Sequence, residues 1–140
     1  MYSKKKINGN KQIIKSKYKL KEGNIYFFLF NINYTDNNYD FDIGFGNIEL
    51  FNTKKCMREK GGICLSNKGL FIDGINVNEK IKIKKGEIFF FLILKEKKYF
   101  FLIRNGECDG VFNFNLTNIY ALASIERNDD SVELKTYISL

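Results

Sequence analysis

The chain has 140 residues, a formal net charge of +7 and no histidine. This length has room for one hydrophobic core, and a hydrophobic content of 44% is sufficient to build it. Without His the chain cannot form a Ser–His or Cys–His nucleophilic pair, and it lacks the commonest general base and metal ligand. The composition therefore argues against most hydrolytic enzymes and against histidine-based metal sites.

The positive charge is concentrated at the N-terminus. Residues 1–22 hold eight lysines against one acid, whereas residues 23–140 hold fifteen basic and fifteen acidic residues. Such asymmetry is typical of a basic arm beside a folded body. The arm either keeps the protein soluble or contacts phosphates of RNA or an acidic partner. Apolar residues between positions 12 and 20 predict that part of it joins a sheet as a first strand. The lysines that would contact phosphates are Lys4, Lys5, Lys6, Lys11 and Lys15.

Beyond the arm, apolar and aromatic runs of strand length alternate with turns rich in Gly, Asn and Asp. Asp73-Gly74 and Asn105-Gly106 are strong signals for tight turns, and the polar residues 52–60 predict a loop. A helix is an alternative to a strand only at residues 121–126. Strands at about 8–12-residue spacing predict an all-β sandwich or barrel. In chain order we predict strands at 25–32, 41–46 with a continuation through 48–51, 61–65, 69–72, 88–94, 99–103, 110–114, 119–125 and 132–134.

Two of these strands, 88–94 and 99–103, are apolar on both faces and should therefore lie centrally. A two-layer sandwich buries only one face of each sheet. The other face is then either shielded by loops or exposed as a patch that docks onto a partner.

Several short motifs follow one another in a fixed order along the chain. They are Asn24–Leu29, Asp42-Ile43-Gly44-Phe45, Lys85-Gly86-Glu87 before a long apolar strand, Asn105-Gly106-Glu107, Gly110-Val111-Phe112 and Tyr120-Ala121-Leu122-Ala123. From about residue 20 to the end, this order resembles that of a SPRY domain. The family's usual Trp residues are absent, including a Trp-Gly pair expected near Gly61-Gly62, and the loops are short, so this chain would be a minimal member. The resemblance implies a two-layer antiparallel β-sandwich over 23–140, with residues 1–22 as the arm.

The function implied by this resemblance is non-catalytic binding of another protein, as a peptide segment or a folded surface, through loops at one edge of the sandwich. Binding residues in this family lie in variable loops and do not transfer by position. Chosen by residue type, and open to the alternative that each is an ordinary surface residue, the candidates are Tyr34, Asn38, Tyr39, Arg58, Arg104 and Arg127.

We expect no catalytic site, metal or cofactor. The close carboxylates Asp36, Asp40 and Asp42, and the pair Asp129 and Asp130, fall in turn-forming segments without EF-hand spacing. No Gly-rich phosphate loop precedes a helix. The three cysteines, which show no CxxC spacing, are expected to be reduced thiols: Cys56, Cys64 and Cys108.

Three alternatives remain. The first is a small RNA- or ribosome-associated structural protein whose arm contacts phosphates. The second is a subunit held within a larger assembly. The third is a forkhead-associated domain, suggested by 73–78 but lacking the His of its phosphopeptide loop. No apolar run reaches ~18–20 residues, and the first residues lack the apolar stretch of a secretory signal. We therefore expect a cytoplasmic protein without membrane partners.

Overall fold

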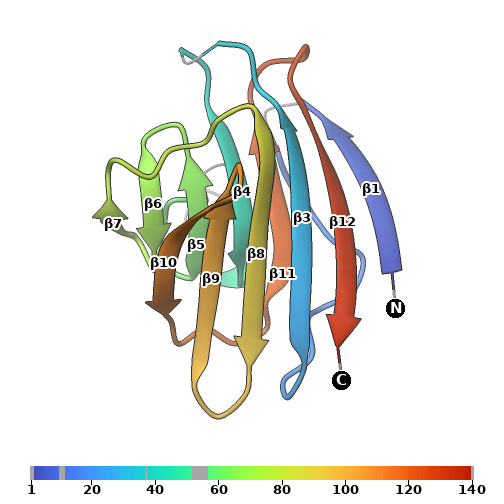
Figure 1. Cartoon of the computed structure of the whole chain (residues 1–140), viewed down its shortest axis with the longest axis vertical. Helices are drawn as coiled ribbons and strands as arrows, with labels where there is room; N and C mark the ends of the chain where they lie inside the picture. Colours follow the sequence, from blue (N-terminus) through green and yellow to red (C-terminus); the bar gives the residue numbers. More distant parts are fainter. Residues whose placement is uncertain (1, 10–11, 37, 52–56, 140) are drawn as a thin grey trace.

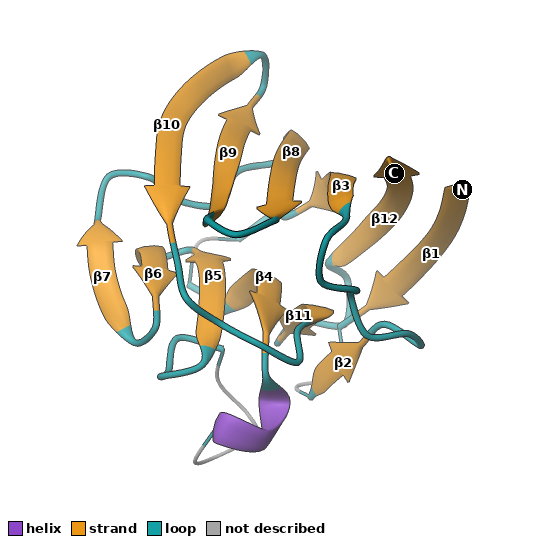
Figure 2. Ribbon diagram, turned by 90° about the horizontal axis from the view of Figure 1, so that it is seen from below, coloured by secondary structure: helices purple, strands orange, loops and turns teal. Residues whose placement is uncertain are grey.

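The computed structural model describes residues 2–9, 12–36, 38–51 and 57–139. Within these residues, twelve strands form two six-stranded antiparallel sheets that pack face to face, so the protein is a two-layer antiparallel β-sandwich (Figures 1 and 2). Sheet A has the order β1 (Tyr2–Asn8), β12 (Ser131–Ser139), β3 (Ile25–Asn33), β8 (Gly86–Leu94), β9 (Lys98–Arg104) and β10 (Glu107–Asn113). Sheet B has the order β2 (Ile13–Lys15), β11 (Tyr120–Ile125), β4 (Phe41–Gly46), β5 (Gly62–Ser66), β6 (Gly69–Ile72) and β7 (Ile75–Asn78).

The basic N-terminal segment contributes an edge strand to each sheet. β1 pairs with β12 along its whole length, and β2 pairs with β11 through Ile13, Ile14 and Lys15. Leu20 is buried, and its N–H donates to the carbonyl of Ile119. The described residues of this segment, 2–9 and 12–22, are therefore built into the sandwich on both sides, and their removal would uncover two sheet edges.

Most predicted strands are present with similar bounds. β1 was not predicted, β12 extends well beyond the predicted 132–134, and three further segments differ. Residues 48–50 form a 3₁₀ turn instead of continuing β4, because the side chain of Asn47 caps it by accepting from the N–H of Glu49. Residues 121–125 are strand and not helix, since β11 is paired on both sides by β2 and β4. β7 was not predicted; it follows the Asp73-Gly74 turn, where both residues have positive φ, and its four residues are exposed.

The core is an aromatic cluster that joins the two sheets. Phe45 of sheet B lies 4.7 Å from Phe28, 5.1 Å from Phe90 and 6.2 Å from Phe30, measured between ring centroids, and the last two pairs meet edge to face. All four rings are at most 1% exposed. Tilted and edge-to-face pairs at these separations add to the free energy gained from burial alone.

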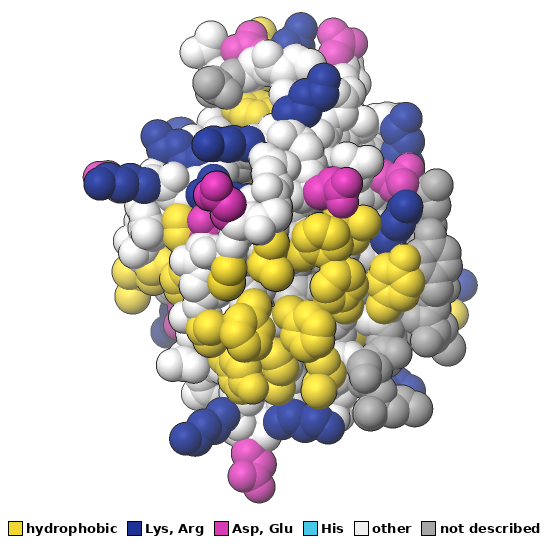
Figure 3. Space-filling model, viewed as in Figure 1, with side chains coloured by type: hydrophobic (Ala, Val, Ile, Leu, Met, Phe, Trp, Pro, Cys, Tyr) yellow, Lys and Arg dark blue, Asp and Glu magenta, His cyan; other side chains and the backbone are white. Residues whose placement is uncertain are grey.

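The outer faces of the two sheets differ. On sheet B, Cys64 and Leu122 are covered by Phe51 and Met57 from the connection between β4 and β5, which makes a second, smaller core. On sheet A, the outward side chains of β3, β8 and β9 form an exposed apolar patch (Figure 3). Of the two alternatives for the outer face of strands 88–94 and 99–103, the structure therefore shows the exposed patch, since the described loops do not shield it.

Of the other cysteines, Cys108 is exposed on β10, and Cys56 lies outside the described residues. No helix among the described residues is long and apolar enough to cross a membrane.

Replacing Gly44 by Ala should destabilise the protein by more than about 3 kcal/mol, because an added Cβ would lie 1.9 Å from the carbonyl oxygen of Ile63 on the neighbouring strand. Gly23→Ala is the matched control. Gly23 also has a positive φ, +89°, but nothing lies within 4 Å of its Cβ position. That variant should lose only about 1–2 kcal/mol for backbone strain. Urea denaturation measures both, and equal losses would contradict the assigned register of β4 and β5.

Candidate functional site

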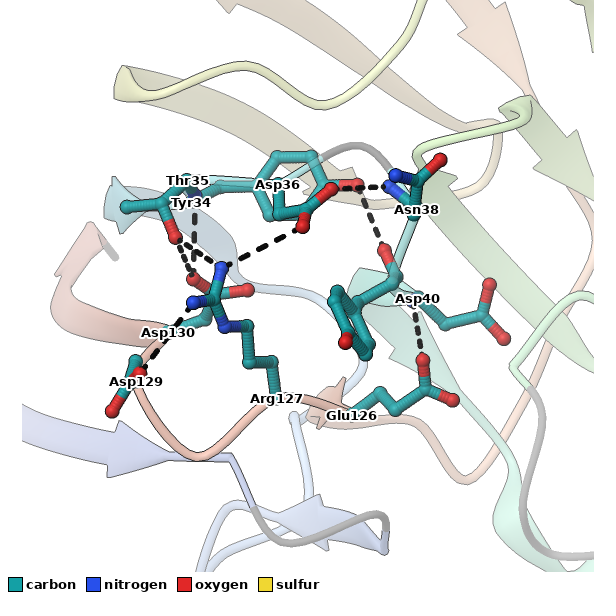
Figure 4. Close-up of polar contacts among 10 residues, drawn as sticks. Tyr34, Thr35, Asp36, Asn38, Asp40, Glu126, Arg127, Asp129 and Asp130 are labelled. Atoms are coloured by element: carbon teal, nitrogen blue, oxygen red, sulfur yellow. Dashed lines mark hydrogen bonds and ion pairs between the residues drawn. The ribbon is translucent and has the colours of Figure 1, made fainter.

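Five of the six candidate binding residues lie in or beside loops that converge at one end of the sandwich. The connection 34–40 runs from β3 in sheet A to β4 in sheet B, and the connection 126–130 returns from β11 to β12. We call residues 34–40, Arg58 and 126–130 the loop end; Figure 4 shows most of it. Asn37 lies outside the described residues.

Arg127 joins the two connections. Its Nη1 donates to Thr35 Oγ1 at 3.1 Å and lies 3.8 Å from a carboxylate oxygen of Asp36. Its Nη2 lies 3.6 Å from Asp129 (Figure 4). The guanidinium carbon lies 5.5 Å from the ring centroid of Tyr39. A planar guanidinium makes these contacts simultaneously because its donors point in fixed directions and its face can stack on an aromatic ring.

Two carboxylates add further links between the same connections. Asp130 is fully buried, and its Oδ1 accepts from both the N–H (3.2 Å) and the hydroxyl (2.9 Å) of Thr35. Glu126 accepts from the N–H of Asp40 through its side chain, and its own N–H donates to the carbonyl of Asp40 at 3.0 Å. The loop end is therefore held in one arrangement by hydrogen bonds between residues some 90 positions apart in sequence.

Tyr34 belongs to the core of this end and not to its surface. It is 6% exposed, its hydroxyl donates to the carbonyl of Tyr39 at 2.8 Å, and its ring packs 5.1 Å from that of Phe41. Burial, with the negative charges of Asp130, Asp36 and Asp40 nearby, raises the pKa of Tyr34 to about 12. Its ring has no surface to offer a partner.

Arg58 is likewise committed to internal contacts. Its guanidinium lies 3.3 Å from Asp40 and 3.7 Å from Asp42, and its side chain is 15% exposed. Asp42 sits in β4 and is 2% exposed. Burial raises the pKa of the Asp42 carboxyl to about 6, an effect that Arg58 opposes and Asp40 reinforces.

Arg104 lies apart from the loop end. It pairs with Asp109 through Nε and Nη2, and its Nη1 donates to the carbonyl of Lys82 at 2.8 Å. These contacts tie the β9–β10 hairpin to the segment before β8. The structure therefore leaves Asn38, Tyr39 and Arg127 as the candidate residues with accessible side chains at the loop end.

The acidic side chains around Arg127 do not form a metal site, since no three Cys, Asp or Glu side chains of the described residues converge in ligating geometry. They instead make this end rich in hydrogen-bond acceptors. Asp129 and Asp36, with side chains 80% and 35% exposed, lie beside Arg127, whose guanidinium is over the ring of Tyr39.

A separate basic surface follows β2, and we call residues 15–19 with Tyr120 the basic edge. Lys15 Nζ stands 4.4 Å over the ring of Tyr120, Lys17 stands 5.3 Å over that of Tyr18, and Tyr18 is 73% exposed. Of the lysines predicted to contact phosphates, Lys6 lies on β1 opposite Glu133, and Lys11 lies outside the described residues, as do the side chains of Lys4 and Lys5. A shallow depression of about 230 Å³ here is lined by Lys15, Lys19, Asn47, Ile48, Glu49, Asn118 and Tyr120.

Sequence reasoning missed the residues that hold the loop end together, namely Thr35, Glu126 and Asp130. They belong to polar turn segments, and nothing in their spacing shows that the two segments meet. The basic edge could have been predicted from the sequence, because Lys alternates with Ser and Tyr over residues 15–19, a pattern typical of an exposed extended segment.

Comparisons with known proteins add the following. No protein-family model matches the chain, and no curated protein matches it. Among solved structures, 36 chains match, including an alginate lyase, AlgAT5 from polysaccharide lyase family 7. That match has a TM-score of 0.43 and 11% sequence identity, and it covers 85% of this chain and 61% of the lyase. The chain thus spans less than two thirds of the length of the lyase.

The pH dependence of stability should change when Asp42 is replaced by Asn. In the folded protein the carboxyl of Asp42 keeps its proton up to about pH 6, whereas in the unfolded chain it ionises near its ordinary pKa of 3.8. Between these pH values the folded state binds the extra proton, so the free energy of unfolding falls as pH rises.

Relative to Asp42→Asn, the wild type should therefore lose roughly 3 kcal/mol between pH 4 and pH 7, and no more above that range. Urea denaturation at a series of pH values measures this. A difference between the two proteins that does not vary with pH would show that Asp42 is ionised in the folded state.

Replacing Arg127 by Ala should loosen the loop end without unfolding the sandwich. The variant loses the contacts to Thr35, Asp36 and Asp129, and because Arg127 is a third exposed we expect a loss of only about 1 kcal/mol. Hydrogen exchange in 34–40 and 126–130 should become faster. Arg104→Ala is the control, and it should affect 104–113 and the segment around Lys82 but not 34–40. Unchanged exchange at 34–40 would contradict the joining role of Arg127.

Proposed function

We propose that the protein is a non-catalytic, cytoplasmic protein-interaction module of the SPRY type that binds its partner through the loop end. The observation that carries this proposal is the convergence of Asn38, Tyr39 and Arg127, which come from two connections between the sheets and are locked together by Arg127 and Asp130. The SPRY assignment rests on the ordered set of sequence motifs and requires an antiparallel sandwich of this kind.

The arrangement suits recognition because it is already ordered before a partner arrives. Binding that must first order a loop loses free energy to conformational entropy, and a loop already held by hydrogen bonds avoids much of that cost. Tyr and Arg are the residue types that most often dominate a protein interface. Tyr39 is 40% exposed, and the guanidinium of Arg127 lies over its ring, 5.5 Å from the centroid.

The charges at the loop end indicate the kind of segment that would bind. Asp36 and Asp129 flank the Arg127–Tyr39 pair with exposed carboxylate oxygens. A partner segment carrying a Lys or Arg next to an apolar side chain would satisfy both features, since its charge would meet the carboxylates and its apolar part would cover the ring of Tyr39.

A second candidate function is RNA binding through the basic edge. The observation that favours it is the pairing of lysines with aromatic rings at Lys15–Tyr120 and Lys17–Tyr18. Lysines provide phosphate contacts, and an exposed aromatic ring such as Tyr18 can stack on a base.

One affinity capture from native lysate distinguishes the two candidates, using the full chain with and without RNase. Tyr39→Ser removes an exposed ring at the loop end, and Tyr18→Ser is its matched control at the basic edge. If the loop end binds, Tyr39→Ser should reduce capture of the partner about tenfold or more, while Tyr18→Ser and RNase leave it unchanged.

The opposite result assigns the function to the basic edge. Capture that is lost on RNase treatment or with Tyr18→Ser, but retained with Tyr39→Ser, contradicts the loop-end proposal. We use substitutions and not deletion of residues 1–22, because that segment supplies β1 and β2 to the two sheets.

A further inference from the structure

The outer face of sheet A carries a row of apolar side chains that crosses five strands. The strand register places Tyr137 of β12, Phe27 of β3, Phe91 of β8, Phe101 of β9 and Val111 of β10 next to one another in that order. Because side chains alternate along a strand, residues two positions away share the same face. A second row contains Leu29, Phe89 and Ile103, and a third contains Ile25, Ile93 and Tyr99.

We call these three rows the aromatic face, and Figure 3 shows it as one continuous apolar area. Its rings contact one another across the strands: Phe27 lies 5.1 Å from Phe89 and 5.7 Å from Phe91, and Phe91 lies 6.3 Å from Phe101, between ring centroids. Phe91 is 38% exposed, and at the two ends of the row Tyr137 and Val111 are 43% and 53% exposed.

The dimensions of the aromatic face match those of a sheet-on-sheet contact. Five strands about 4.8 Å apart span roughly 20 Å, and three rows span roughly 14 Å along the strands. The face of a sheet is complementary to another sheet packed about 10 Å away. A contiguous apolar patch of roughly 280 Å² is close in size to the largest patch on a typical monomer, and such a patch often has a function.

The charges bordering the aromatic face show which partner fits. On β8 and its following turn, Glu87 lies four residues before Phe91, and Lys95 lies four residues after it. Glu133 of β12 lies at the same end of the sheet as Glu87, but its charge is already met by Lys135, whose Nζ is 3.9 Å away. Lys97 is in the same turn as Lys95. Figure 3 shows acidic side chains above the apolar area, with Lys or Arg beside them at the upper right, and Lys or Arg side chains directly below it.

We propose that the aromatic face binds the aromatic face of a second copy of this chain in a symmetric dimer. A two-fold axis that lies in the interface and runs across the strands at the level of Phe91 reverses the strand direction of the partner. It sets Phe91 against the Phe91 of the second copy and brings the Glu87 end of one copy onto the Lys95 end of the other. A two-fold interface requires such self-complementarity, since the same patch serves both copies.

The alternative axis, running along the strands, is disfavoured by the same charges. It would set Glu87 of one copy against Glu87 of the other, and like charges placed together at an interface cost free energy. The reversed arrangement also points the two loop ends in opposite directions. The dimer therefore goes beyond the proposed function without obstructing it, and it makes the protein bivalent for a partner that binds the loop end.

Sedimentation velocity of the purified full chain tests the dimer. The wild type should sediment as a dimer. Phe91→Lys should raise the dimer dissociation constant by at least about 100-fold, because the positive charges introduced in the two copies would lie against each other at the two-fold axis. Val77→Lys, which changes an equally exposed side chain on β7 of sheet B, should leave the dimer intact. Circular dichroism and thermal unfolding of each variant confirm that it folds.

Charge reversal tests the orientation of the two copies. Glu87→Lys and Lys95→Glu should each weaken the dimer about tenfold, and the double variant should restore it, because the reversed charges again face each other. A monomeric wild type at about 100 µM, or a dimer that survives Phe91→Lys, overturns the proposal. A double variant weaker than either single variant overturns the antiparallel arrangement. Tyr39→Ser should remain dimeric, so a failure of loop-end binding is separable from a failure of the dimer.

Discussion

The structure depends on the insertion of Phe45 among Phe28, Phe30 and Phe90. Phe45 comes from sheet B and the other three rings come from sheet A, so this cluster decides how the two sheets lie against each other. Aromatic rings in edge-to-face contact tolerate little sliding, because each fits a gap left by the others. Gly44 is set beside Phe45, with the neighbouring strand too close for any side chain at that position.

This packing also places the loop end. The connections 34–40 and 126–130 each cross from one sheet to the other, so the path of each is decided by the separation and alignment of the sheets. Arg127, Thr35 and Asp130 then hold the two crossings together over a short distance. The exposed ring of Tyr39 is presented by contacts whose partners lie far away in the sequence, and its orientation follows from the sandwich as a whole.

Both faces of sheet A are apolar, and the fold buries only one of them against sheet B. Phe28, Phe30 and Phe90 point into the core, while their neighbours Phe27, Phe89 and Phe91 point outward on the same strands. On sheet B the corresponding outer face is covered by Phe51 and Met57. The proposed dimer gives sheet A the cover that sheet B obtains from its own chain, and it leaves the loop ends accessible.

The sequence by itself determined the strand content, the tight turns and the class of fold. Period-two alternation and Asn-Gly or Asp-Gly turns act through the local backbone, and Asp73-Gly74 and Asn105-Gly106 take positive φ as those dipeptides predict. Only the tertiary structure decided that Tyr34 is buried, that Arg58 and Arg104 are committed to internal ion pairs, and that five side chains from Tyr137 to Val111 align in one row. Those outcomes depend on strand order and register, which are set by contacts between residues far apart in the chain and leave no local pattern.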